Sequence, residues 1–355
     1  MALVYFSYYL YIIVMEIQNL KSAILALAVA DRNNLLKDIT ESLQDNNSSS
    51  KASRRHILDN KMGQCPHCSH DKYVRFGIDK GSQRYKCKSC KRSFTEYTGT
   101  WLAGLQRKDM VADYLELMLQ EKGLDKISET LGINKKTAFD WRHKILAALD
   151  NKDDEDDFTG ITESDETFFL RSEKGMDVND RKSRKRGGRS NKRGISNDQV
   201  AVIVTQDRKS TLDLRVAKLG RIGKLDIENA IGKRVKKGVT ILCSDSHHSY
   251  KGFARDKEME FHPVNASKGE RVKGNYHIQH VNSTHNRIKK WIDNTFWGVS
   301  TKYLQQYLNW HRAKESIKLR SDKANAFVEI TINIGALERF GQIQTQYEKL
   351  ISTQS

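Results

Sequence analysis

Four of the five cysteines in this chain of 355 residues form two close pairs. They are Cys65 and Cys68 in CPHC, and Cys87 and Cys90 in CKSC, with the eighteen residues 69–86 between the pairs. Two CxxC pairs at this spacing are typical of one tetrahedral zinc ion held by four thiolates. We therefore predict a zinc ribbon over residues 62–95, with a structural zinc because protein ligands fill all four positions. Four reduced cysteines without a metal are the alternative.

Two aspartates occupy positions that would suit phosphoryl transfer assisted by Mg²⁺ or Mn²⁺. Such chemistry needs carboxylates that converge on two metal ions from separate elements of the fold. Asp165 lies in the apolar segment ITESDETFFL, and Asp245 ends the apolar segment GVTILCSD. The eighty positions from one to the other leave room for intervening strands of one sheet. Each aspartate alone could be an ordinary polar residue at the end of an element.

A third metal ligand should come from a helix that follows the sheet. The segment 277–292, HIQHVNSTHNRIKKWI, has a helical pattern but contains no Glu or Asp, and Asn282 is the residue best placed. An amide carbonyl can bind a hard cation, but it brings no charge. Lys289 lies seven residues later on the same helical face, where it could clamp a phosphate. Glu166 and His280 are competing ligand candidates.

Six of the eleven histidines fall between His247 and His285. This density indicates a polar groove that faces DNA, and a second zinc site is a less favoured interpretation.

The segment 105–150 has the pattern of a helix-turn-helix. Gly132 follows a short apolar helix as a stop signal, and Asn134 can cap the next helix. The second helix would bury Ala138, Trp141, Ile145 and Leu149 on one face. It would then leave Lys135, Lys136, Thr137, Arg142, His143 and Lys144 available to DNA. A plain helical hairpin would have the same periodicity.

The composition favours a polyanionic partner. The chain has 61 Lys and Arg against 44 Asp and Glu, a net charge of +17. Solubility alone is the simpler reading of that charge. A hydrophobic content of 38% indicates a folded chain, and so few cysteines do not form a disulfide scaffold. A reducing, cytoplasmic compartment is therefore expected.

A change of pattern near residues 151–157, an acidic hinge, marks a domain boundary. Short apolar segments then indicate strands, and helical stretches at 224–234 and after 278 complete a mixed α/β core. The basic loop 178–196 adds Arg184, Arg186 and Arg189 as candidate DNA contacts. The expected order is a helical segment and linker at 1–61, the zinc ribbon, the helix-turn-helix region, a catalytic domain at 158–312 and a helical tail at 313–355.

The first fifteen residues, MALVYFSYYLYIIVM, are too few to span a bilayer and lack the basic start of a signal peptide. We expect no membrane association and a true start at Met15, with a short membrane anchor as the alternative.

In combination, these motifs resemble a known family. The order CPHC, CKSC, SFTEYTGTWL, SDETFF, a basic loop, CSDSHHSY, HIQHVNSTHNRIKKWI and GVSTKYLQQYLNWHR resembles the insertion-sequence transposases related to Merlin elements. The similarity runs from about residue 62 to residue 312. The resemblance implies a ribonuclease-H-like domain of the DDE type, a polynucleotidyl transferase that cuts at terminal inverted repeats and joins the 3′ ends to target DNA.

The resemblance also assigns the site residues. Asp165 and Asp245 match the two aspartates of the family, Asn282 stands at the position of the third acid, and Lys289 matches the family's lysine. Double-stranded DNA is the implied partner, a homodimer or larger synaptic assembly is expected, and the protein would be nucleoid-associated. Two alternatives remain: a DNA-binding protein with an inactive catalytic domain, and a ribonuclease-H-like nuclease without strand transfer.

Overall fold

The computed structural model describes residues 63–352, apart from residues 80, 151–155, 177–187, 189, 191, 246 and 265–271. All of these residues belong to the second of two compact units, Asn60–Ser355, and the helical segment expected at 1–61 lies outside them. No helix in this described part is long and apolar enough to cross a membrane.

The first sheet is small and antiparallel. Strands β1 (Tyr73–Asp79), β2 (Ser82–Cys87) and β3 (Ser93–Thr95) pair in sequence order. Its core contains Cys65, Cys87 and Phe94, and Tyr73 and Tyr85 pack against them. Because this core is so small, the side chains alone bury little apolar surface, and an additional crosslink is needed for stability.

Short helices follow the ribbon. They are η1 (Lys108–Met110), α3 (Val111–Leu119), α4 (Leu124–Leu131) and α5 (Lys135–Ala148). Gly132 ends α4 with a left-handed φ of 62°, a conformation that glycine adopts without strain. The side chain of Asn134 caps α5 by accepting a hydrogen bond of 2.8 Å from the Lys136 N–H. Gly132 therefore ends α4 and Asn134 begins α5, as the sequence predicts.

The segment expected to be a tail packs against the helix-turn-helix. After η4 (Thr301–Tyr303) come α9 (Leu304–Ser316), α10 (Lys323–Thr331) and α11 (Ala336–Ser352), and α10 contacts α3 while α11 contacts α5. Asn333 donates to the Ala148 carbonyl at 2.8 Å, and Arg339 donates to the Ala147 carbonyl at 3.0 Å. The last carbonyls of α5, which have no partner within the helix, therefore find donors in the C-terminal segment.

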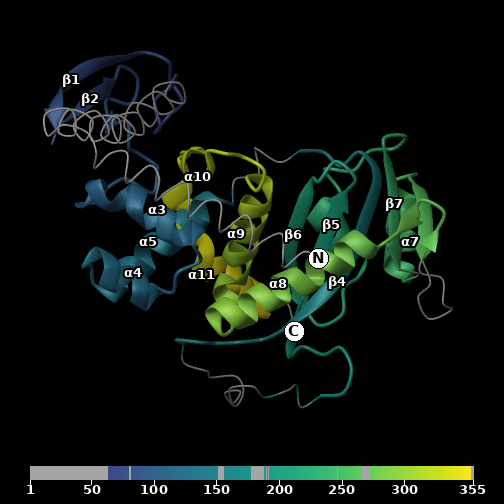
Figure 1. The fold of residues 1–355 in the computed structure, drawn as a ribbon. Helices are drawn as coiled ribbons and strands as arrows, with labels where there is room; N and C mark the ends of the chain where they lie inside the picture. Colours follow the sequence, from purple (N-terminus) through teal and green to yellow (C-terminus); the bar gives the residue numbers. More distant parts are fainter. Residues whose placement is uncertain are drawn as a thin grey trace, which may run out of the picture. The chain divides into compact units, whose positions relative to one another are not determined.

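The main sheet has five strands in the order β6-β5-β4-β7-β8 (Figure 1). Their bounds are Gly160–Leu170 (β4), Gln199–Asp207 (β5), Leu212–Leu219 (β6), Thr240–Asp245 (β7) and Glu260–Val264 (β8). Strand β5 is antiparallel to both of its neighbours, β4 and β6, whereas β4, β7 and β8 are parallel to one another. This strand order is that of the ribonuclease-H-like fold, and the predicted mixed α/β class is confirmed.

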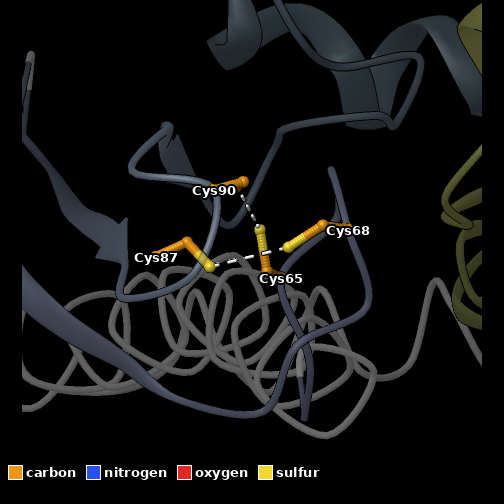
Figure 2. A group of neighbouring side chains, drawn as sticks. All are labelled: Cys65, Cys68, Cys87 and Cys90. Atoms are coloured by element: carbon orange, nitrogen blue, oxygen red, sulfur yellow. Dashed lines mark hydrogen bonds between the residues drawn. The ribbon is translucent and has the colours of Figure 1, made fainter.

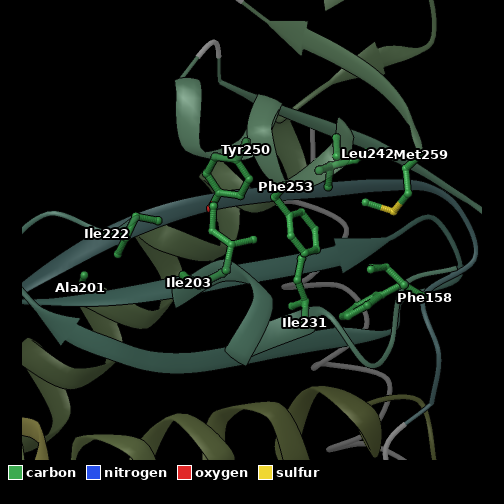
Figure 3. Close-up of a cluster of buried hydrophobic side chains, with 12 residues drawn as sticks. Phe158, Ala201, Ile203, Ile222, Ile231, Leu242, Tyr250, Phe253 and Met259 are labelled. Atoms are coloured by element: carbon green, nitrogen blue, oxygen red, sulfur yellow. The ribbon is translucent and has the colours of Figure 1, made fainter. Parts of the chain in front are cut away.

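Helices cover the two faces of this sheet. On one face, α6 (Lys224–Ile231) and α7 (His248–Asp256) form a hydrophobic core with the sheet, which includes Leu242 and Tyr250 (Figure 3). Figure 1 shows α8 (Gln279–Phe296) lying across the sheet, where it contacts β4 and β5. The short strands β9 (Val272–Lys273) and β10 (Tyr276–His277) precede it.

Strand alternation decides which residues face α8. Phe168 of β4 and Leu242 of β7 belong to the core under α6 and α7. Because successive side chains of a strand point to opposite faces, the odd-numbered residues of both strands face the other way, toward α8.

Candidate functional sites

The four cysteine thiols of the ribbon converge on one point (Figure 2). The Sγ atoms of Cys65 and Cys90 are 3.7 Å apart, those of Cys68 and Cys87 are 3.6 Å apart, and all four lie within 4.8 Å of one another. The backbone N–H of Ser89 points at the Cys87 sulfur at 3.3 Å, an orientation that favours a thiolate. This donor set fits a structural zinc ion, as the sequence predicts.

The helix α5 presents part of the expected DNA-facing surface. Lys135 and Lys136 are exposed, and Thr137 and Lys144 are half-buried. The ammonium of Lys135 also pairs with Asp125 at 2.6 Å. The arginines proposed in the basic loop, Arg184, Arg186 and Arg189, lie outside the described residues.

Arg142 and His143 do not belong to that surface, so this part of the prediction is wrong. Arg142 is only 1% exposed, donates to the Lys122 carbonyl at 2.6 Å and lies 5.4 Å from the centre of the Trp310 ring. His143 is buried against the ring of Tyr303. Both belong to the packing of α5 on η4 and α9, which come more than 150 residues later in the chain and could not be seen in the local pattern.

The two predicted aspartates meet on the face that α8 covers. Strands β4 and β7 pair at an offset of eighty residues, the last pair being Glu163 with Cys243, and the aspartates lie two residues further along each strand. Burial, then the charges of Glu166 and Asp245, raise the pKa of Asp165 to about 8. The two aspartates are therefore close enough to repel each other.

Glu166, the next residue along β4, is a third carboxylate nearby, but strand alternation directs it toward the sheet face that α6 and α7 cover. Burial, followed by the charge of Asp245, raises the pKa of Glu166 to about 7, and Arg221 opposes this shift. Its Oε2 is a buried atom for which the described residues offer no hydrogen-bond partner. Half-buried carboxylates that repel one another, such as Asp165 and Asp245, make a site where a divalent cation would be favourable, because carboxylate oxygens are its preferred ligands. This donor set fits Mg²⁺ or Mn²⁺.

The helix α8 contributes one face to the same region. Asn282, His285 and Lys289 follow one another at helical spacing; His285 is buried, and the other two are half-buried. Burial, then the charge of Lys289, lower the pKa of His285 to about 4, and a hydrogen bond with the Asp165 backbone opposes this shift. Burial also lowers the pKa of Lys289. His285 was not among the predicted site residues, although its position three residues after Asn282 places it on that face.

A second cluster, also missed, surrounds Glu163 at the start of α8. This carboxylate is 1% exposed, and His277, His280 and Arg208 all contact its Oε1. His280, proposed from the sequence as a competing ligand, instead places its Nδ1 2.7 Å from this oxygen. No local pattern identifies Glu163, because its partners are far away in the sequence.

Known proteins resemble this chain in the region of the main sheet. Residues 158–311 match the family described as the ISXO2-like transposase domain. A relative over 261 residues, 26% identical, is an uncharacterized protein in transposable element ISH50 of Halobacterium salinarum. That match covers 71% of this chain and 85% of the relative. The predicted kinship with insertion-sequence transposases is confirmed.

Among solved structures, the chain is similar to Mos1 transposase complexes. The pre-cleavage Mos1 transpososome is 12% identical, with 69% of this chain and 80% of that chain covered and a TM-score of 0.21. The Mos1 paired-end complex with the left transposon end is 13% identical, with 70% and 80% covered and a TM-score of 0.25.

Proposed function

We propose that this transposase cuts DNA at the ends of its own mobile element and joins the new 3′ ends to target DNA. The observation that carries the proposal is the half-buried pair Asp165 and Asp245, on neighbouring strands of a region that matches a transposase domain. The pair lies on the sheet face that α8 covers, and α8 carries the third candidate, Asn282.

Each side chain has a distinct part in the reaction. Asp165 and Asp245 would hold Mg²⁺ or Mn²⁺, and Asn282 would add a neutral carbonyl ligand. When bound, the metal ions activate the attacking oxygen and neutralise charge on the scissile phosphate. Lys289 adds positive charge on the Asn282 face, where it would hold a phosphate of the cut strand. No covalent bond between protein and DNA is required, because water and then the 3′-OH attack phosphorus directly.

Other parts of the chain would hold double-stranded DNA. The candidates on α5 are Lys135, Lys136, Thr137 and Lys144, with the loop arginines Arg184, Arg186 and Arg189 as further contacts. The zinc ion folds the ribbon and does not take part in chemistry. Because two element ends must be cut together, the active species would be a homodimer or a larger assembly, at work on the nucleoid in the cytoplasm.

The test uses the full chain, zinc-loaded, with a labelled duplex that carries the inverted repeat flanking its gene. Asp165→Ala should abolish Mg²⁺-dependent nicking while binding of the repeat is unchanged. Nicking by Asp165→Ala at the wild-type rate would refute the assignment. Lys209→Gln, an exposed change in a neighbouring turn, is the control and should cut normally.

Asn282→Glu tests the third position. If Asn282 is a metal ligand, the added carboxylate should retain activity at lower Mg²⁺ concentration. An inactive but folded variant would show that Asn282 serves geometry rather than ligation. Two further outcomes decide between functions: binding without nicking indicates a DNA-binding protein, and nicking without joined products indicates a nuclease.

A further inference from the structure

We infer that Glu163 is a positioning residue that fixes the start of α8, and with it Asn282, against the strand that carries Asp165. The inference rests on the proposed function, because Asn282 matters only if this site does chemistry. Glu163 and Asp165 lie two residues apart on the same face of β4, and α8 packs on that face.

The two oxygens of Glu163 have different tasks. Oε2 accepts hydrogen bonds from the backbone N–H groups of His280 at 2.8 Å and Val281 at 3.2 Å. These are among the first N–H groups of α8, which have no partner within the helix. A carboxylate at this end also compensates the positive end of the helix dipole. Glu163 therefore caps α8 from a neighbouring strand.

Oε1 is held by cationic and imidazole groups. The Arg208 guanidinium lies 3.0 Å away, the His280 Nδ1 lies 2.7 Å away and the His277 Nδ1 lies 3.3 Å away. Arg208 follows the end of β5, and it also donates to the Asn275 carbonyl at 3.2 Å. One buried carboxylate thus joins β4, the turn after β5 and the start of α8.

Glu163, His277 and His280 could in principle hold a metal ion, since their ligand atoms lie within 4.8 Å of one another. Arg208, however, places a guanidinium nitrogen 3.0 Å from the carboxylate and 2.5 Å from the His280 Nδ1. The position for a cation is therefore filled by the protein's own side chain. A charge-balanced anchor explains these contacts without a metal.

The anchor acts on Asn282 through a short and rigid path. Asn282 follows Val281 directly, and its own N–H bonds to the Ile278 carbonyl at 3.1 Å within the same first turn. Because Glu163 accepts from the N–H of Val281, the residue before Asn282, a shift of this first turn would also shift Asn282. His285, one turn later, is only 9% exposed, on the helix that contacts β4.

The experiment measures backbone opening and metal binding in the zinc-loaded full chain. Glu163→Gln keeps the shape of the side chain but removes its charge, and it places an amide N–H₂ beside the Arg208 guanidinium. Loss of a charge-assisted hydrogen bond should speed hydrogen exchange in a peptide over residues 278–283 by about tenfold or more. A peptide over residues 286–292 of the same helix is the internal control and should change little.

Manganese binding gives the second measurement. Titration calorimetry with Mn²⁺ should show about 10- to 100-fold weaker binding in Glu163→Gln, the usual effect of losing a group that orients a metal ligand. Arg208→Gln, at a position that is 29% exposed, should act in the same direction and covers the case that Glu163→Gln fails to fold. Lys209→Gln is the matched control for the turn and should leave both measurements unchanged.

The outcomes separate this inference from the proposed function. Unchanged exchange and Mn²⁺ affinity in both Glu163→Gln and Arg208→Gln would overturn the anchor. A second zinc equivalent in the wild type that disappears in Glu163→Gln would also overturn it, in favour of a metal site. If Asp165→Asn retains Mn²⁺ binding and nicking, the proposed function fails, whatever the exchange data show.

Discussion

Asp165 and Asp245 are eighty residues apart in the sequence, and the strands that carry them pair at the same offset of eighty residues. The pairing ends at Glu163 with Cys243, and the same offset places the two aspartates two residues further along each strand. Because the side chains of both strands alternate in step, the two carboxylates share one face. Their mutual repulsion contributes to the raised pKa of Asp165.

Removal of one carboxylate charge should lower the pKa of the other carboxylate. In metal-free protein, Asp245→Asn should lower the pKa of Asp165 from its value of about 8, because a like charge is lost while burial persists. A carboxyl ¹³C NMR titration measures this shift. An unchanged or higher pKa would mean that the two side chains do not interact.

Zinc removal should unfold the ribbon and spare the main sheet. The ribbon's core holds few apolar side chains, so the metal supplies most of its stability. Cys87→Ser should bind about one zinc equivalent less and lose the near-ultraviolet circular dichroism of Tyr73 and Tyr85. Cys243→Ser, at the buried cysteine outside the ribbon, should keep its zinc. Full zinc content in Cys87→Ser would contradict the four-thiolate site.

Acid should destabilise the protein through its buried histidines. Burial lowers the pKa of His143 from 6.5 to about 4, so between these values the unfolded chain binds a proton that the folded chain does not. The stabilisation is present above pH 6.5 and is lost as the pH falls toward 4. For His143 alone the loss is about 3 kcal/mol. His285 and His311 act in the same direction.

Denaturant unfolding between pH 7 and pH 4 checks this dependence. His143→Gln should reduce the slope of the unfolding free energy against pH, whereas His70→Gln, at a surface position, should not. Equal slopes in the wild type and His143→Gln would show that His143 is accessible to protons in the folded protein.

Arg142 should matter for folding rather than for DNA. Arg142→Met removes a buried hydrogen bond to the Lys122 carbonyl and the contact with Trp310, and should lower the unfolding free energy by about 2–4 kcal/mol. Lys136→Gln should change it by less than about 0.5 kcal/mol. In salt titrations of DNA binding, Lys136→Gln should reduce the slope of log K against log salt by about 1. Arg142→Met with unchanged stability and this reduced slope would restore the original surface assignment.

The cap of α5 offers a small and clean test. Asn134→Ala removes the acceptor of the Lys136 N–H and should cost about 1 kcal/mol of unfolding free energy. Asn286→Ala, at an exposed position in the middle of α8, is the matched control and should change stability by less than about 0.5 kcal/mol. Equal effects in the two variants would argue against the cap.

Local chemistry made much of the fold predictable. Short local patterns identify the apolar strand segments and the helix boundaries at Gly132 and Asn134. The paired cysteines have the spacing that is typical of a zinc ribbon. Asp165 and Asp245 could be proposed because each lies in a recognisable strand. In these cases the residue type and its immediate neighbours determine the conformation.

The failures have a common physical cause. Arginine is a residue type that is usually found at the surface. Arg142 is buried because η4 and α9 pack over α5. Glu163 looks like any polar strand residue until α8 and Arg208 are brought to it. Contacts between segments more than a hundred residues apart leave no periodicity in the sequence, so these roles required the structure.

The contacts of α5 with the C-terminal segment can form only late in synthesis. The Ala147 and Ala148 carbonyls obtain their donors from Arg339 and Asn333, which leave the ribosome almost two hundred residues later. A nascent chain that already contains every carboxylate of the cluster still lacks this support for α5, the helix proposed to contact DNA. A gene copy truncated by a frameshift after α9 would therefore encode all of these acidic residues without the segment that supports the end of α5.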